Sequence, residues 1–232
     1  MEIDIYHLIE GARKAVGLTV VIDVFRAFSV ACYVSANGAK DIIPVGDIEL
    51  AYKLKRENPD LILMGERKGK IQPGFDFGNS PAHIENVDFS GKTVVHTTSA
   101  GTQGIVNAVN ADEIITGSFV NIYAVVDYIK MRKPQKVSLV CMGDRALSHS
   151  DEDTFCAEYI RSLLLGIPYD IDEAKEKLKI GSGKRFFDIR NNDWSPERDF
   201  YMCLDVGKFD FVLKAEKNTS GLFHLRKIKI NM

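Results

Sequence analysis

Short apolar segments rich in β-branched residues alternate with amphipathic segments of helix length, and this alternation constrains the fold most. Six segments are apolar at consecutive positions, as buried parallel strands are: residues 18–24, 41–45, 61–64, 93–96, 113–116 and 136–141. Segments with helical spacing of apolar residues lie at 27–36, 47–57, 101–110, 120–131 and 151–165. The alternation predicts a three-layer α/β/α fold in which right-handed crossovers place helices on both faces of a mostly parallel sheet.

The regular pattern ends at about residue 166. A chain of 232 residues fits one hydrophobic core, so we expect a single α/β domain over residues 1–232. Its motif-bearing core covers about 18–166, and a less regular C-terminal extension covers about 167–232. In the extension, residues 170–178 are amphipathic and helical, whereas 199–226 predict an irregular or antiparallel tail with a hairpin near 218–221.

Composition and charge exclude several classes of protein. Lysine and arginine number 30 against 32 acidic residues, so no basic excess attracts a nucleic acid. No apolar run approaches the roughly 20 residues that cross a bilayer. The acidic start of the chain lacks the pattern of a signal peptide. We therefore expect a cytoplasmic protein with no nucleic-acid or membrane partner, and a homodimer is the default assembly.

Cysteines and histidines give no support for other chemistry. The four cysteines are far apart and form no CxxC pair, so we expect buried free thiols. No histidine belongs to an HExxH motif, which disfavours a zinc hydrolase, and His96 in its apolar strand is expected to be a core residue. The absence of GxGxxG weakens a dinucleotide-binding interpretation.

Polar residues follow five of the predicted strands. These strand ends read Asp23-Val24-Phe25-Arg26, Gly65-Glu66-Arg67-Lys68, Thr97 to Thr102, Gly117-Ser118-Phe119-Val120-Asn121 and Met142-Gly143-Asp144. In an open parallel sheet the ligand crevice lies beyond the carboxyl ends of the strands. Hydroxyls and helix N-terminal amides bind phosphate oxygens, arginine clamps them, and carboxylates hold a divalent cation. The pattern predicts a phosphorylated or otherwise anionic ligand.

Each of these elements also has a purely structural interpretation. Asp23 is either a catalytic carboxylate or a cap, and Arg26 could simply pair with it. The long segment 65–81 is either an active-site loop or a solvated one, although Phe75 and Phe77 would anchor it and aim the carboxylate of Asp76. The hydroxyls of residues 97–99 could do no more than start a helix, and Asp153 could serve only the N-terminus of its helix.

Together these segments resemble the 2-phosphosulfolactate phosphatase family. The matching stretches run in order over roughly residues 20–165: VIDVFRAFSVACYVSANGA from Val21, GERKGKIQPGFDFGNSP from Gly65, GKTVVHTTSAGTQGI from Gly91, GSFVN from Gly117, and LVCMG with the later EDTFCAE. The pair GFDFGNSP and TTSAGT makes the resemblance specific. The region after Gly166 is less typical, and Ala100 stands where many members have a polar side chain.

The resemblance implies a magnesium-dependent phosphatase with its own α/β fold. The family hydrolyses 2-phospho-3-sulfolactate to sulfolactate and inorganic phosphate, a step in coenzyme M synthesis, and accepts phosphate esters of other 2-hydroxycarboxylic acids. By position, the implied functional residues are Asp23, Arg26, Glu66, Arg67, Asp76, Asn79, Thr97, Thr98, Ser99 and Asn121.

Our working assignment divides the candidate residues by role. Catalysis is assigned to Asp23, Arg26, Glu66 and Asp76. Mg²⁺ is assigned to carboxylates among Asp23, Glu66, Asp76 and Asp153. Binding of the small phosphate ester is assigned to Arg67, Asn79, Thr97, Thr98, Ser99, Ser118 and Asn121. The nucleophile is either a water or Asp23, and two other functions stay open: a non-catalytic binding protein for a phosphorylated metabolite, and a sugar-phosphate isomerase.

Overall fold

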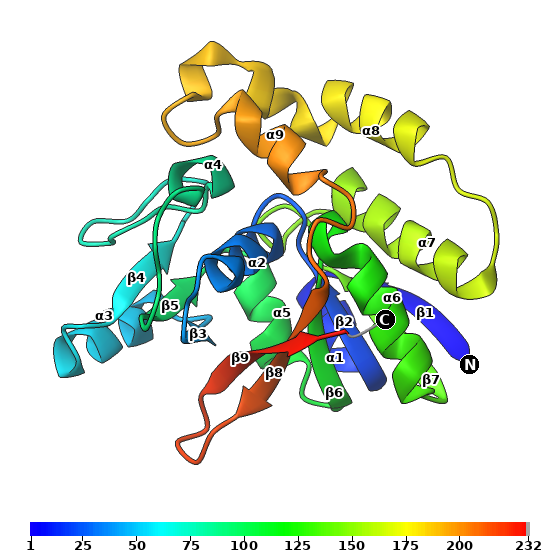
Figure 1. The fold of residues 1–232 in the computed structure, drawn as a ribbon, viewed down its shortest axis with the longest axis horizontal. Coiled ribbons are helices and arrows are strands. Elements are labelled where there is room, and N and C mark those ends of the chain that lie inside the picture. Colours follow the sequence, from blue (N-terminus) through cyan, green and yellow to red (C-terminus); the bar gives the residue numbers. More distant parts are fainter. Residues whose placement is uncertain (231–232) are drawn as a thin grey trace.

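The computed structural model describes residues 1–230. Its strands form two sheets, and its helices pack around them (Figure 1). The strands are β1 (Glu2–His7), β2 (Gly17–Ile22), β3 (Asp41–Pro44), β4 (Ile62–Gly65), β5 (Thr93–Thr97), β6 (Ala111–Gly117), β7 (Lys136–Cys141), β8 (Phe211–Lys217) and β9 (Phe223–Lys229). The α-helices are α1 (Leu8–Lys14), α2 (Ala27–Ala36), α3 (Ile48–Glu57), α4 (Pro81–Ile84), α5 (Gly101–Asn107), α6 (Ile122–Arg132), α7 (Asp151–Leu165), α8 (Ile171–Ile180) and α9 (Glu197–Cys203). The short 3₁₀ helices are η1 (Phe119–Asn121), η2 (Ser182–Phe187) and η3 (Ile189–Asn191).

The larger sheet is mostly parallel and the smaller one wholly parallel. The larger has the order β1-β7-β2-β6-β8-β9, in which β8 and β9 are antiparallel, and the smaller has the order β3-β5-β4. This confirms the α/β class, and every strand and helix predicted in the core is present within a few residues. The mostly parallel sheet is present as predicted, and the second, smaller sheet is an addition that the sequence did not indicate. Alternation predicts parallel crossovers, but it carries no information on which strands pair.

Strand β1 at the edge of the larger sheet escaped the sequence analysis. It pairs with β7 in register, Ile3 opposite Val137, and its residues are mostly half-buried. The segment EIDIYH alternates polar and apolar residues, as a strand with one covered face does. A search for continuous apolar runs finds only strands that are buried on both faces.

The C-terminal extension is built into the rest of the fold. Its strands β8 and β9 form the predicted antiparallel hairpin, and β8 joins the edge of β6. The side chain of Asn218 closes the turn by accepting hydrogen bonds from the backbone N–H groups of Ser220 and Leu222. Helix α9 was not predicted. Figure 1 shows α8 and α9 along one edge of the molecule, where α8 contacts α7 and α9 contacts α4.

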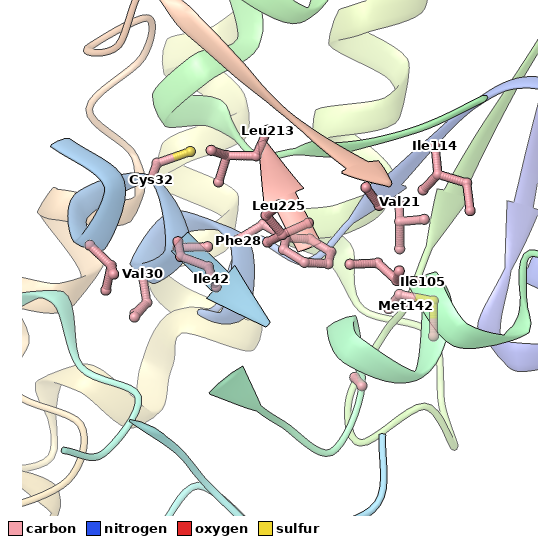
Figure 2. Packing of buried hydrophobic residues seen from close by; sticks show 14 of the residues in the cluster. Val21, Phe28, Val30, Cys32, Ile42, Ile105, Ile114, Met142, Leu213 and Leu225 are labelled. Carbon is pink, nitrogen blue, oxygen red and sulfur yellow. The ribbon is translucent and has the colours of Figure 1, made fainter. Parts of the chain in front are cut away.

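A buried apolar cluster joins the two sheets through helix α2. Figure 2 shows Phe28 of α2 close to Leu225 of β9 and Ile105 of α5, with Ile42 of β3 on one side and Val21 of β2 on the other. All four cysteines are free and buried, as expected. Within residues 1–230, every helix is too short or too polar to span a bilayer.

Candidate active site

A cavity of about 300 Å³ opens beyond the carboxyl ends of strands from both sheets. Its walls come from the loops after β2, β4, β5 and β7 and from the C-terminal extension. The lining residues are Asp23, Phe25, Arg26, Glu66, Lys68, Gly69, Asn79, Ser99, Ala100, Gly143, Asp144, Arg145, Glu152, Arg185 and Trp194. The crevice therefore lies where parallel sheets ordinarily place a ligand.

Asp23 lies directly after β2 and is held by two backbone amides. Its Oδ1 accepts a hydrogen bond from the N–H of Ala27 at 2.9 Å, and its Oδ2 accepts one from the N–H of Gly101 at 2.8 Å. A Cβ atom on Gly101 would lie 2.8 Å from that Oδ2 and 2.8 Å from the Cβ of Ala27, so the bond depends on glycine. The two amides fix the carboxylate between the β2–α2 and β5–α5 loops.

Burial, together with the nearby carboxylates of Glu66 and Glu152, raises the pKa of Asp23 to about 7, against the two amides that lower it. The side chain is only 6% exposed. A carboxyl with a pKa near neutrality can both accept and return a proton under ordinary conditions, which is the property that acid–base catalysis requires.

Glu66, after β4, is fixed in a similar way. Its Oε1 accepts a hydrogen bond from the N–H of Ser99 at 2.7 Å, and its Oε2 accepts from the N–H of Gly69 at 2.6 Å and from the hydroxyl of Ser99 at 3.1 Å. Glu66, Gly69 and Ser99 all line the cavity. Glu66 thus links the β4 and β5 loops, and its carboxylate is held without an ion pair in the described chain.

Arg26 lines the cavity, but its guanidinium is engaged elsewhere. Its Nη1 lies 2.6 Å from Oδ2 of Asp199 and 2.6 Å from the carbonyl oxygen of Trp194. Asp199, which is fully buried, also accepts hydrogen bonds from the hydroxyl of Ser80 and the N–H of Ala82. Arg26 therefore ties the β2–α2 loop to the extension, and it does not pair with Asp23 as one interpretation of the sequence had it.

Asp76, which the sequence analysis assigned to catalysis and metal binding, lies outside the cavity lining. Phe75 is buried and Phe77 half-buried, so both anchor the loop as expected. The residue between them, Asp76, is exposed, however. The Asp76 carboxylate consequently faces outward, where it accepts from the N–H of Leu63 at 2.8 Å and pairs with Lys55 at 3.3 Å.

Arg67 also points away from the cavity. Its guanidinium donates to the hydroxyl of Thr97 at 2.8 Å and to the carbonyl oxygen of Gly46 at 3.2 Å. Thr98 is buried and exchanges hydrogen bonds with Thr102 in the first turn of α5. These contacts organise the β5–α5 loop. The three predicted ligand-binding residues that make them lie outside the cavity lining: Arg67, Thr97 and Thr98.

Ser118 and Asn121 form a capping box at η1 behind the site. The Asn121 side chain accepts from the N–H of Ser118 at 3.1 Å, and the two Oγ atoms of Ser118 and Ser29 lie 2.6 Å apart. Both residues are buried and outside the cavity lining. Their hydroxyl and amide groups are occupied within the fold, so neither is placed to contact a ligand.

Asp153 stands behind the cavity, and Asn79 lines it. The two Asp153 oxygens accept from the N–H groups of Val24 and Gly143, each at 2.8 Å, and so join the β2 and β7 loops. Burial raises the pKa of Asp153 well above its ordinary value. The Asn79 side-chain oxygen lies 3.2 Å from Nε2 of His96, a buried core histidine as expected, whose pKa burial lowers to about 4.

Four cavity residues were missed by the sequence analysis: Arg145, Glu152, Arg185 and Trp194. Glu152 precedes Asp153 in the first turn of α7, so the same acidic helix start could have indicated it. Arg185 and Trp194 belong to the extension, where no strand end marks them. A Cβ on Gly69 would lie 2.5 Å from the ring of Trp194, which shows how closely the extension covers the β4 loop.

The carboxylates of Asp23, Glu66 and Glu152 suit a divalent cation that arrives with an anionic ligand. Among residues 1–230, no three His, Cys, Asp or Glu side chains cluster closely enough to hold a metal ion by themselves. The Glu152 Oε2 is buried and has no hydrogen-bond partner in the described chain. Mg²⁺ is ordinarily bound by one or two carboxylates together with water and substrate phosphate, so a two-carboxylate set is sufficient.

The fold and the cavity define an α/β protein with a polar crevice, which carboxylates and arginines line beyond the strand ends of two mostly parallel sheets. The chain belongs to the 2-phosphosulfolactate phosphatase family, as its motifs indicated. The model of that family, described as 2-phosphosulpholactate phosphatase, matches residues 3–218.

Relatives over most of the chain carry the same family name. A protein of Bacillus subtilis (strain 168) named "Probable 2-phosphosulfolactate phosphatase" is 32% identical over 222 residues, covering 94% of this chain and 95% of the relative. One of Thermoplasma acidophilum with the same name is 32% identical over 197 residues, or 84% of each chain. One of Thermotoga petrophila, also so named, is 44% identical over 124 residues, covering 53% of this chain and 52% of the relative.

Proposed function

We propose that the protein hydrolyses 2-phosphosulfolactate, or the phosphate ester of a related 2-hydroxycarboxylic acid, to the hydroxy acid and inorganic phosphate. The observation that carries the proposal is Asp23: a buried carboxyl, fixed by two backbone amides at the meeting point of the strand ends, with a pKa of about 7. The family relationship supports the substrate class, because the relatives are named for it.

In this proposal Asp23 acts as the general base. A water molecule beside Asp23 attacks phosphorus, and Asp23 takes the proton that the water loses. The ester P–O bond breaks as the new one forms, and Asp23 returns its proton to the alkoxide of the leaving hydroxy acid, which leaves the carboxylate ionised for the next turnover. Glu66 and Ser99 hold the opposite loop of the cavity in place during this exchange.

We further propose that the reaction depends on Mg²⁺, held by the carboxylates of Glu66 and Glu152, so that Asp23 stays free to exchange a proton. When bound, the cation would neutralise charge on the phosphate oxygens in a loose transition state. The buried and unpartnered Oε2 of Glu152 supports this assignment, because an ionised oxygen without a partner is costly inside a protein. Location in the cytoplasm and assembly as a homodimer remain predictions, to be checked by cell fractionation and by sedimentation.

The test is the release of inorganic phosphate from racemic 2-phosphosulfolactate and from 2-phospholactate, each with Mg²⁺ and with EDTA. We expect release from at least one substrate, abolished by EDTA and restored by excess Mg²⁺. Release that EDTA leaves unchanged would refute the metal assignment alone. No release from either substrate by folded protein would refute the proposed function.

A further inference from the structure

The two arginines expected to bind the anionic ligand are both committed to other groups. Arg26 is neutralised by the fully buried Asp199, and Arg67 donates to a threonine hydroxyl and a carbonyl oxygen outside the cavity. A substrate with a phosphate and further acidic groups nevertheless needs cationic partners besides the metal. The other cations of the cavity lining are Lys68, which is exposed, Arg145 and Arg185.

Arg185 of η2 is the cavity arginine whose charge is not paired. Its Nη2 donates to the carbonyl oxygen of Phe25 at 3.0 Å, and its Nε is buried with no hydrogen-bond partner. Among residues 1–230, no carboxylate lies within ion-pair distance of it, in contrast to Arg145 at the rim, which is half exposed and pairs with Asp144. A buried and unpaired N–H donor on a charged group is unfavourable unless a ligand satisfies it.

Aromatic rings hold the Arg185 guanidinium in position. Its central carbon lies 4.9 Å from the ring centroid of Phe186 and 5.9 Å from that of Phe25. Phe186 is itself buried and packs edge-on against Phe25, with ring centroids 4.9 Å apart. Contact with two rings restricts where the guanidinium can lie, and a guanidinium fork can recognise a carboxylate or sulfonate through two parallel hydrogen bonds.

We infer that Arg185 binds the acidic group of the substrate that is not transferred, and so selects for phosphate esters that carry a second anion. This inference rests on the proposed function. The reacting phosphate belongs beside Asp23 at the strand ends, whereas Arg185 reaches the cavity from the extension. Because the phosphate has the cation and Asp23 as partners, the second acidic group of the substrate is the anion left for Arg185, which meets the β2–α2 loop at Phe25. The C-terminal segment thereby becomes part of the specificity site.

The test compares Arg185→Met with wild type on four phosphate esters. 2-Phosphosulfolactate carries a carboxylate and a sulfonate, 2-phospholactate only the carboxylate, the phosphate ester of 2-hydroxyethanesulfonate only the sulfonate, and ethyl phosphate neither. We expect kcat/KM for 2-phosphosulfolactate to fall by roughly 30- to 100-fold, mainly through KM, since a charge-assisted contact is lost. For ethyl phosphate we expect no change.

The two esters with a single second anion show whether Arg185 contacts the carboxylate or the sulfonate. Only the ester that carries the contacted group should lose kcat/KM in Arg185→Met. Arg185→Lys keeps the charge but not the fork, and we expect a smaller loss. Arg190→Met is the matched control, since Arg190 lies five residues further along the extension with its side chain 85% exposed, and it should leave all four rates unchanged. Circular dichroism and thermal unfolding show whether each variant is folded.

An equal loss on all four esters would place Arg185 on the transferred phosphate and overturn the inference, and no loss on any would also overturn it. If wild-type protein releases phosphate from none of them, the proposed function fails instead. Calorimetric binding of sulfolactate then decides: a Kd that Arg185→Met weakens at least 10-fold supports the inference, and unchanged or absent binding contradicts it.

Discussion

Replacement of Asp199 by alanine tests how the extension is fastened to the site. Asp199 is fully buried and lies 2.6 Å from the Nη1 of Arg26, whose side chain is 3% exposed. It also accepts hydrogen bonds from the hydroxyl of Ser80 at 2.8 Å and from the N–H of Ala82 at 3.0 Å. The substitution leaves one buried cation and two buried donors without their partner.

The cost follows from these contacts. Removing one member of a buried ion pair destabilises a protein by about 3–5 kcal/mol, and each orphaned neutral donor adds about 1 kcal/mol or more. We therefore expect the free energy of unfolding to fall by about 5–7 kcal/mol, a large share of the roughly 5–15 kcal/mol that stabilises a typical domain. The double variant Arg26→Met/Asp199→Leu removes both charges and should recover about half of this loss or more.

Urea unfolding followed by far-UV circular dichroism measures these differences. Glu85→Ala is the matched control, because Glu85 pairs with Arg198 of the same helix α9, but the two side chains are 36% and 61% exposed. That variant should lose less than about 1 kcal/mol. The reasoning is refuted if Asp199→Ala costs no more than the control, or if the double variant is as unstable as the two single changes added together.

Three further results are expected. Asp76→Asn should leave phosphate release within about two-fold of wild type, since its carboxylate faces Lys55 at the surface, and a loss above 10-fold in an enzymatic assay would return it to the site. Gly101→Ala should lower stability by about 1–3 kcal/mol in urea unfolding and abolish phosphate release, because its Cβ would displace the Asp23 carboxylate; wild-type kinetics would contradict this. The folded-state pKa of Asp23, about 7, lies above the ordinary 3.8, so its contribution to stability is complete below about pH 4 and is lost as the pH rises through 7. In EDTA, the unfolding free energy of wild type should accordingly fall more steeply between pH 4 and 8 than that of Asp23→Asn, and parallel pH profiles would disprove the assignment.

The strand ends were the predictable part of the site. Asp23, Glu66 and Ser99 each lie within two residues of the end of a parallel strand. Residues at the carboxyl ends of parallel strands meet at one crevice, so their position could be predicted. The same rule failed for Arg67 and Asp76 because it fixes where the backbone emerges and not which way a side chain turns. Direction depends on partners such as Thr97 and Lys55, which come from other parts of the chain.

The contribution of the extension could not be read from the sequence. Asp199 meets Arg26 across 173 residues, and Arg185 meets the carbonyl of Phe25 across 160. Neither contact can be recognised from a periodicity or a spacing in the sequence. Each depends on how the extension folds back over the strand ends. The pairing of strands into two sheets has the same origin, because alternation along the chain is compatible with either arrangement.

The most direct test of the account compares wild-type protein with Asp23→Asn in phosphate release from 2-phosphosulfolactate with Mg²⁺ present. Asparagine preserves the size of the side chain but cannot take a proton from water, so we expect kcat to fall by at least about 100-fold. Circular dichroism should show that the variant is folded. Phosphate release within a few-fold of wild type by folded variant would contradict the central claim that Asp23 carries the reaction.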